Sequence, residues 1–389
     1  MENKLNTRNK KGEGSIALRP NGTYYGRITL EGLPKKTFYG KTEKEVRTKM
    51  NAYKEQAIRG EAFVKKIFVS DYIEEWLINY KQPSLKPASY DRLEVTFKEH
   101  IKDSYVGRCQ LGSIRSTDIQ KLINSKTDTL SYSSIKKIYQ LLNACFRYAV
   151  TSRDLSFNPM DGVLMPKEAV LAKKTKEVPT LTPAELEKLY EASKLTYSTG
   201  NIRFRYGYAY ILIANTGLRC GEALALTWDC VDFTKNTIRI NKSVERTKNR
   251  SGKSENKTLR IIGETKTKNS NRIIPLNARA KEALLFYKAL QEKEGLQTNY
   301  VIATNTGQIV QNGAFQNMLN NMLKQLNISH IGIHSLRHTF ATNLIHSGVD
   351  VKVVSKLLGH ASVSITYNTY VHTTMDDAIL AVQALEKCS

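Results

Sequence analysis

The stretch from Ile333 to His372 constrains this chain most, because it sets several polar side chains among apolar residues at helical spacing. It reads IHSLRHTFATNLIHSGVDVKVVSKLLGHASVSITYNTYVH, and its candidate functional residues are His334, Arg337, His360, Tyr367 and Tyr370. His334 and Arg337 are three residues apart, so on a helix they share one face. Together, these groups suit the task of holding a phosphodiester and attacking it with a phenol.

A further cationic motif lies upstream, in Thr216-Gly-Leu-Arg219-Cys-Gly-Glu222. Arg219 is predicted at the start of a helix, where free N–H groups and the helix dipole already favour anions. Its guanidinium adds a two-pronged donor for phosphate oxygens. Glu222 is in position to orient Arg219, although an ordinary surface ion pair explains the same spacing.

Two lysines, Lys266 and Lys268, lie in a segment predicted to form the tip of a β-hairpin. A lysine on a mobile hairpin can reach into a site and protonate a leaving oxygen. The residues alone do not choose between the two, and a solvated turn is the plainer interpretation of either.

Metal and nucleotide chemistry are not indicated. His338 follows His334 by four residues, but Ser335 stands where a zinc HExxH motif has Glu, and no Cys or carboxylate cluster supplies further ligands. The chain has no GxxxxGK[ST] loop for ATP and no carboxylate cluster for two-metal nuclease chemistry. We therefore expect no cofactor and no metal.

The charge of the chain predicts a polyanionic partner. Its 389 residues carry a formal net charge of +23, with a pI near 9.6, and such a surplus repels itself in a compact state. No apolar run approaches the ~18 residues that span a bilayer, and the N-terminus lacks the apolar core of a signal peptide. The five scattered cysteines form neither a CxxC pair nor a disulfide ladder, which fits a reducing cytosol.

Residues 1–62 are predicted to form a three-stranded sheet followed by a helix. Strands 14–19 and 23–30 flank the turn Pro20-Asn-Gly, strand 37–39 follows, and a capping box at Thr42 starts the helix. Through Lys66 there are 16 basic and 7 acidic residues, so the sheet is a candidate for insertion into a DNA groove. The candidate contacts are Arg19, Tyr25, Arg27, Lys35 and Lys36.

Residues 67–164 are predicted to be all helical. The expected helices start at a Ser70 cap, at Pro87, at Thr117-Asp118 and near Ser133, each with an apolar stripe. Lys136 and Lys137 are candidates for phosphate contact, although a solvated face explains them almost as well. A charged linker is predicted over 165–177.

Residues 178–389 are predicted to be mixed but mainly helical, so the fold class is multidomain α+β. Segments 237–240, 259–262 and 272–276 are expected to form one small antiparallel sheet. A basic loop between the first two of these strands, Arg246 to Lys253, suits a phosphate backbone and includes Arg250.

The last 210 residues or so resemble the tyrosine recombinase (phage integrase) family. Its sequence boxes, TGLRxGE, a hairpin Lys, HxLRH, LGH and a Tyr, appear here as Thr216–Glu222, Lys266, His334–His338, Leu358–His360 and Tyr370. The middle segment is similar to the family's helical, SAM-like core-binding domain. The N-terminal segment is similar to AP2-like arm-binding domains through KGEGSI and NGTYYGRI. This three-part layout most resembles integrases of conjugative transposons from Gram-positive bacteria.

The resemblance implies a site-specific integrase that works through a 3′-phosphotyrosine intermediate without metal or ATP. The spacing of the boxes favours Tyr370 over Tyr367 as the nucleophile, and Lys266 matches the general acid. The resemblance assigns charge stabilisation to Arg219, Arg337 and His360, and handling of the tyrosine proton to His334.

The implied partners are double-stranded DNA with core and arm sites, three further protomers in a synaptic tetramer, an excisionase and a host DNA-bending protein. The implied location is the bacterial cytoplasm, at the nucleoid. A predicted tail helix bearing Met375, Ile379, Val382 and Leu385 would dock on a neighbouring protomer or on its own domain. Alternatives are a DNA-binding regulator, a type IB topoisomerase and a divalent-metal nuclease.

Overall fold

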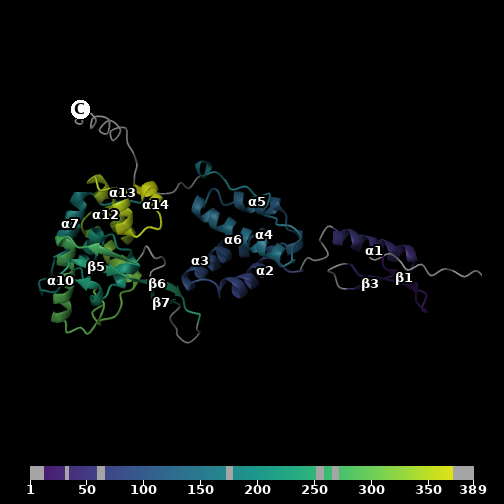
Figure 1. Ribbon diagram of the computed structural model, residues 1–389, viewed down its shortest axis with the longest axis horizontal. Helices are drawn as coiled ribbons and strands as arrows, with labels where there is room; N and C mark the ends of the chain where they lie inside the picture. Colours follow the sequence, from purple (N-terminus) through teal and green to yellow (C-terminus); the bar gives the residue numbers. More distant parts are fainter. Residues whose placement is uncertain are drawn as a thin grey trace, which may run out of the picture. The chain divides into compact units, whose positions relative to one another are not determined.

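The computed structural model describes residues 13–30, 35–58, 66–171, 178–250, 258–264 and 271–370 (Figure 1). The chain separates into two compact units, residues 1–176 and 177–389. The predicted class is confirmed, since an N-terminal antiparallel sheet, a helical core and a mainly helical region with small antiparallel sheets follow in order. Within the described residues, no helix has both the length and the apolar character needed to cross a membrane.

The N-terminal part is a three-stranded meander packed on one helix. Its elements are β1 (Ser15–Leu18), β2 (Tyr24–Ile28), β3 (Lys36–Gly40) and α1 (Glu43–Ile58). The predicted capping residue is present, because the Thr42 hydroxyl accepts the Glu45 N–H at 3.2 Å. Ile28 on the sheet packs against Val46 and Met50 on α1, which leaves the opposite sheet face open.

The helical part follows. Its elements are α2 (Val69–Trp76), η2 (Leu77–Lys81), α3 (Pro87–Phe97), η3 (Lys98–Lys102), α4 (Tyr105–Arg108), η4 (Leu111–Ser113), α5 (Ser116–Asn124) and α6 (Tyr132–Thr151). Pro87 takes the first helical position, as predicted. The prediction that Ser70 caps a helix is wrong, because α2 begins at Val69. The main chain at Phe68 bridges to Gln110, and this long-range pairing sets the start of the helix.

The packed chain continues beyond α6 into the segment predicted as a linker. A short turn, η5 (Glu168–Val170), precedes Leu171, which is 3% exposed and belongs to the helical core. Met165 also packs against this core. The charged residues 172–177 lie outside the described part of the chain.

The second unit is packed around one apolar helix, α8 (Gly207–Thr216). Its helices are α7 (Pro183–Ser193), α8 (Gly207–Thr216), α9 (Cys220–Leu224), η6 (Trp228–Cys230), α10 (Ala278–Lys293), α11 (Asn312–Gln325), α12 (Ile333–His346), α13 (Val351–Leu358) and α14 (Val363–Tyr370). Nearly every residue of α8 is buried, so it forms the centre of the core rather than an amphipathic surface helix. Thr182 is the N-cap of α7 and forms a capping box with Glu185.

The strands of this unit form two sheets, so the prediction of a single sheet is wrong. One sheet has the order β4 (Val231–Asp232), β5 (Thr237–Ile240), β8 (Arg272–Pro275), and the other pairs β6 (Lys242–Lys248) with β7 (Thr258–Glu264). The chain continues almost directly from β5 into β6, so the strand predicted at 259–262 pairs with that continuation. Arg246 therefore lies on a strand, where a loop was predicted.

Candidate active site

A glycine turn delivers Arg219 to the centre of the second unit. Helix α8 ends at Gly217, whose φ of 65° lies in the left-handed region that suits glycine. A Cβ at this position would lie 2.5 Å from the Phe340 ring, so the turn is also a close approach between elements. Leu218 is then buried, and Arg219 is the N-cap of α9, as predicted.

Glu222 is a buried carboxylate held between two arginines. Its side chain is 2% exposed, and its Oε1 accepts from Arg219 Nη1 at 2.7 Å while its Oε2 accepts from the Arg219 N–H at 2.9 Å. Arg272 donates Nη1 to Oε1 at 3.1 Å and Nη2 to Oε2 at 2.8 Å. Burial alone would raise the pKa of Glu222, but the hydrogen bonds and charges of Arg272 and Arg219 lower it below its usual value. The alternative of an ordinary surface ion pair is therefore wrong.

Arg337 lies beneath the site, on α12. Its side chain is 2% exposed and donates Nη1 to the Gly217 carbonyl and Nη2 to the Leu358 carbonyl, both at 2.7 Å. The Arg219 side chain is 34% exposed, so Arg219 is the more accessible of the two arginines.

Two histidines on α12 stand side by side near Arg337. The rings of His334 and His338 meet edge to face, with centroids 5.1 Å apart. The pKa of His334 is lowered by desolvation and by the charges of Arg337 and Arg219, although the residue is exposed. Within the described residues, no group of three or more His, Cys, Asp or Glu side chains is placed to hold a metal ion.

His360 enters the site from the end of α13. Gly359, at φ 65°, ends that helix in the left-handed conformation, and His360 follows it directly. Its Nδ1 is 2.8 Å from the Thr366 hydroxyl on α14. Burial, together with the charges of Arg337 and Arg219, lowers the pKa of His360 to about 4. The imidazole is therefore neutral near pH 7 when no phosphate is bound.

The two candidate tyrosines differ sharply in their surroundings. Tyr367 is 52% exposed, whereas Tyr370 is 9% exposed and its ring lies 5.2 Å from that of His338. Burial raises the pKa of Tyr370, and the charges of Arg337 and Arg219 offset part of that rise. Of the two, Tyr370 therefore lies among the candidate site residues.

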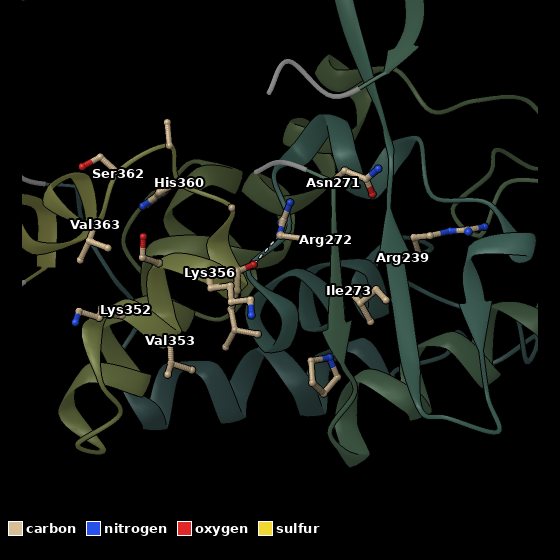
Figure 2. A pocket seen from close by; sticks show the side chains of 15 residues that line it. Arg239, Asn271, Arg272, Ile273, Lys352, Val353, Lys356, His360, Ser362 and Val363 are labelled. Carbon is tan, nitrogen blue, oxygen red and sulfur yellow. Dashed lines mark hydrogen bonds between the residues drawn. The ribbon is translucent and has the colours of Figure 1, made fainter. Parts of the chain in front are cut away.

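Sequence reasoning missed Arg272, which the structure places next to the predicted arginines. Its Nε donates to the Leu357 carbonyl at 2.6 Å, a bond drawn in Figure 2. Arg272 and His360 line a pocket of about 950 Å³ beside α13. The sequence offered one signal. Arg272 occupies the first position of β8, and the alternation of strand residues places it on the same inward face as Ile274.

The predicted general acid cannot be placed, because Lys266 and its rival Lys268 lie outside the described residues. Arg246 on β6 and Arg250 just beyond it are both exposed. In the helical part, Lys136 and Lys137 on α6 are exposed.

The candidate contacts on the N-terminal sheet divide between its two faces. Arg19 lies 4.5 Å from the ring centroid of Tyr39 and 5.7 Å from that of Tyr25, and Arg27 lies 5.1 Å from Tyr25. These groups form a cationic and aromatic cluster on the open face. Lys35, just before β3, is exposed. By contrast, Lys36 lies 4.4 Å from the ring of Tyr53 on α1, so it is placed with the helix side of the sheet.

Comparison with known protein families agrees with this geometry. The model of the phage integrase family matches residues 179–377, which is just over half of the chain. The chain belongs to the phage integrase family. The model of the N-terminal SAM-like domain of phage integrases also matches, over residues 68–127 in the helical part.

The relatives of this integrase-family chain include a tyrosine recombinase and a transposon transposase. It is 29% identical to a protein named tyrosine recombinase XerC-like from Caldanaerobacter subterraneus subsp. tengcongensis, with 94% of this chain and 96% of the relative covered. It is 26% identical to the transposase from transposon Tn916 of Enterococcus faecalis, with 74% and 70% covered.

A solved structure shares the fold of this family member. The Tn1549 transposon integrase, in complex with a circular intermediate DNA, superposes with a TM-score of 0.68 at 22% identity. The match covers 82% of this chain and 99% of that one.

Proposed function

We propose that this chain is a site-specific tyrosine recombinase that integrates and excises a mobile element, either a conjugative transposon or a prophage. It cuts and rejoins DNA through a 3′-phosphotyrosine intermediate. One observation carries the proposal: α9, α12, α13 and α14 bring two guanidiniums, two neutral imidazoles and a buried phenol within electrostatic reach of one another.

In the proposed reaction, the Tyr370 hydroxyl oxygen attacks the scissile phosphorus while the bond from phosphorus to the 5′ oxygen breaks. The new bond is a 3′-phosphotyrosine ester, and the departing 5′ oxygen takes a proton from Lys266. Arg219, Arg337 and His360 donate to the non-bridging oxygens, whose charge grows in the five-coordinate transition state. A 5′ hydroxyl of a second strand then attacks this ester, and Tyr370 leaves with its proton restored.

The pKa directions support the role of His334 as the group that takes the tyrosine proton. The raised pKa of Tyr370 means that the phenol is protonated and needs a base before it can attack. The lowered pKa of His334 leaves its imidazole neutral at pH 7, which is the form that accepts a proton.

This chemistry requires no metal ion and no ATP in our proposal. Guanidinium donors supply the positive charge that a divalent ion would otherwise bring. The phosphotyrosine ester keeps the free energy of the broken phosphodiester, so rejoining needs no external energy source.

Each part of the chain has its own proposed role on the DNA. We assign residues 1–62 to arm sites, 67–164 to core-site binding and 178–389 to catalysis, with 165–177 as the linker. The Arg19, Tyr25 and Arg27 cluster on the open sheet face supports the arm-site role, and Lys35 extends it. Lys136, Lys137, Arg246 and Arg250 are proposed contacts to core-site phosphates.

Strand exchange between two duplexes calls for four active sites, so the proposed working form is a homotetramer on DNA. An excisionase and a host DNA-bending protein are the proposed accessory partners. Because the substrate is chromosomal and element DNA, the proposed place of action is the bacterial nucleoid in the cytoplasm.

A covalent trapping experiment tests the proposal. The full chain is incubated in EDTA with nicked double-stranded DNA that spans the junction between the encoding element and its flanking DNA. The nick lets the cleaved strand diffuse away, so any protein–DNA ester accumulates and appears on a denaturing gel. Tyr367→Phe is the matched control for Tyr370→Phe, since it removes the same hydroxyl one helical turn away.

Each outcome has a definite meaning. We expect a band from the wild type and from Tyr367→Phe, and none from Tyr370→Phe. Loss of the band only in Tyr367→Phe would keep the activity and change the nucleophile. Salt-sensitive DNA binding without any band would favour the regulator, and cleavage that EDTA abolishes would favour the metal nuclease. Relaxation of supercoiled DNA without exchange between two sites would favour the type IB topoisomerase.

A further inference from the structure

Arg272 is a buried cation at an inward-facing position of a strand. It is the first residue of β8, in register with Ile240 on β5. Its side chain is 5% exposed, whereas its neighbour Ile273, which turns the other way, is 64% exposed. Burying a charge is costly unless the group is paired and hydrogen-bonded, so the partners of this side chain explain its place.

The guanidinium of Arg272 joins two elements of the proposed site. Its two terminal nitrogens hold both oxygens of Glu222, at 3.1 and 2.8 Å, and its Nε holds the Leu357 carbonyl on α13 at 2.6 Å. A planar fork with fixed donors can make these three bonds together, and a lysine ammonium cannot. Figure 2 shows Arg272 reaching from its strand toward the end of α13, with His360 beyond it.

Each of these partners controls a group that is proposed to contact DNA. Glu222 fixes Arg219 through two hydrogen bonds, one to its guanidinium and one to its main-chain N–H. The last turn of α13 carries His360, and its main-chain position decides where that imidazole lies.

The end of α13 is bound by three arginines in succession. Arg272 donates to the carbonyl of Leu357, Arg337 to that of Leu358 and Arg219 to that of Gly359. The final carbonyls of a helix lack partners within it and carry partial negative charge, so guanidiniums are suitable caps. If one arginine moves, the three consecutive carbonyls at the end of α13 shift, and the other two arginines lose their hydrogen-bond geometry.

We infer that Arg272 is a positioning residue of the transesterification site, which orients Arg219 through Glu222 and His360 through the end of α13. This inference rests on the proposed recombinase function. Arg272 does not contact the phosphate in this scheme. A displacement of about 1 Å in a catalytic group can cost on the order of 100-fold in rate, so loss of two of the three Arg272 bonds given above should slow cleavage strongly.

The test compares Arg272→Lys with Arg279→Lys in the full chain. Arg279 forms an Arg–Glu ion pair with Glu187 at 2.6 Å on the surface of the same unit, with side chains 37% and 49% exposed. The measurements are the Kd for junction DNA and the single-turnover rate of covalent adduct formation on the nicked substrate. Thermal unfolding checks that each variant is folded.

We expect Arg272→Lys to bind DNA within about threefold of the wild type and to form the adduct roughly 10- to 100-fold more slowly. Arg279→Lys should match the wild type in both. Because Arg272 acts through Arg219, the double variant Arg272→Lys, Arg219→Lys should lose much less than the product of the two single losses.

Several results would overturn the inference. An adduct rate for Arg272→Lys equal to that of the wild type would do so, as would a loss that only follows weaker DNA binding or a smaller folded fraction. Multiplicative losses in the double variant would show that Arg272 does not act through Arg219. If the wild type forms no adduct on any junction DNA, the proposed function itself fails and takes this inference with it.

Discussion

Replacing Glu222 with Gln is the most direct test of how the buried charges of this site are balanced. The substitution keeps the size of the side chain and removes its charge. The four hydrogen bonds to Glu222 come from donors on Arg219 and Arg272, with two on each carboxylate oxygen. A Gln side chain offers one oxygen and one NH2 group, so two of these donors would face another donor.

The cost follows from the burial of the pair. The side chains of Glu222 and Arg272 are 2% and 5% exposed, so solvent does little to screen them. Breaking a buried ion pair by removing one partner costs about 3–5 kcal/mol, because the remaining charge is left uncompensated. The exposed pair of Glu187 and Arg279 provides the control, since Glu187→Gln should cost less than about 1 kcal/mol.

Urea unfolding followed by fluorescence measures the difference. The chain has two tryptophans, Trp76 in the first unit and Trp228 in the second. In a Trp76→Phe background, the emission therefore reports the unit that holds Glu222. With a denaturant slope of about 2–3 kcal/mol per molar urea, Glu222→Gln should lower the midpoint by roughly 1–2.5 M.

The pH dependence has a definite sign. The folded pKa of Glu222 lies below its usual value of 4.5, so the carboxylate contributes stability above that pH and loses it as the pH falls through the folded pKa. The gap between wild type and Glu222→Gln should therefore close in acid. A midpoint shift no larger than that of Glu187→Gln, or a gap that is constant down to pH 3, would refute the assignment of this ion pair.

Two further predictions concern His360 and the N-terminal sheet. The folded pKa of His360 is about 4 against an unfolded value near 6.5, so the unfolded chain binds more protons between these values and stability falls as the pH drops through that window. The drop in the free energy of unfolding between pH 7 and pH 5 should be smaller in His360→Gln than in the wild type. We expect a difference of roughly 1 kcal/mol, because the ring is only half-buried. In DNA-binding titrations, the slope of log K against log salt is negative, and Arg19→Gln and Arg27→Gln should each reduce its magnitude by about 0.9. Lys36→Gln, on the helix side of the sheet, should leave the slope unchanged.

Much of the fold was predictable because its signals are local. The capping pair Thr182 and Glu185 fixes the start of α7, and Pro87 fixes that of α3. The same is true of Arg219, since the left-handed Gly217 ends α8 and α9 begins three residues later, with Arg219 as its N-cap. Such signals depend on a few neighbouring residues, and at these three positions distant packing does not override them.

The features that the sequence concealed depend on contacts between distant segments. Strand β6, KSVERTK, has a polar composition typical of a loop, and its pairing with β7 decides its conformation. Ser70 has the character of a cap, but a main-chain bridge from Phe68 to Gln110 decides where α2 starts. Arg272 belongs to the site only because β8 and α13 meet, and 85 residues separate it from the carbonyl that it binds.

The described part of the site is positively charged, although two of its three arginines, Arg272 and Arg337, are buried. Arg219, Arg272 and Arg337 face a single carboxylate, Glu222, and the lowered pKa values of His334 and His360 keep those rings neutral. Among the residues that the structure describes, this cluster thus carries a surplus of two positive charges. In the proposed reaction, a bound phosphodiester brings one negative charge, and the five-coordinate transition state brings about two. The surplus is matched better by the transition state than by the substrate, and this difference is what accelerates a reaction.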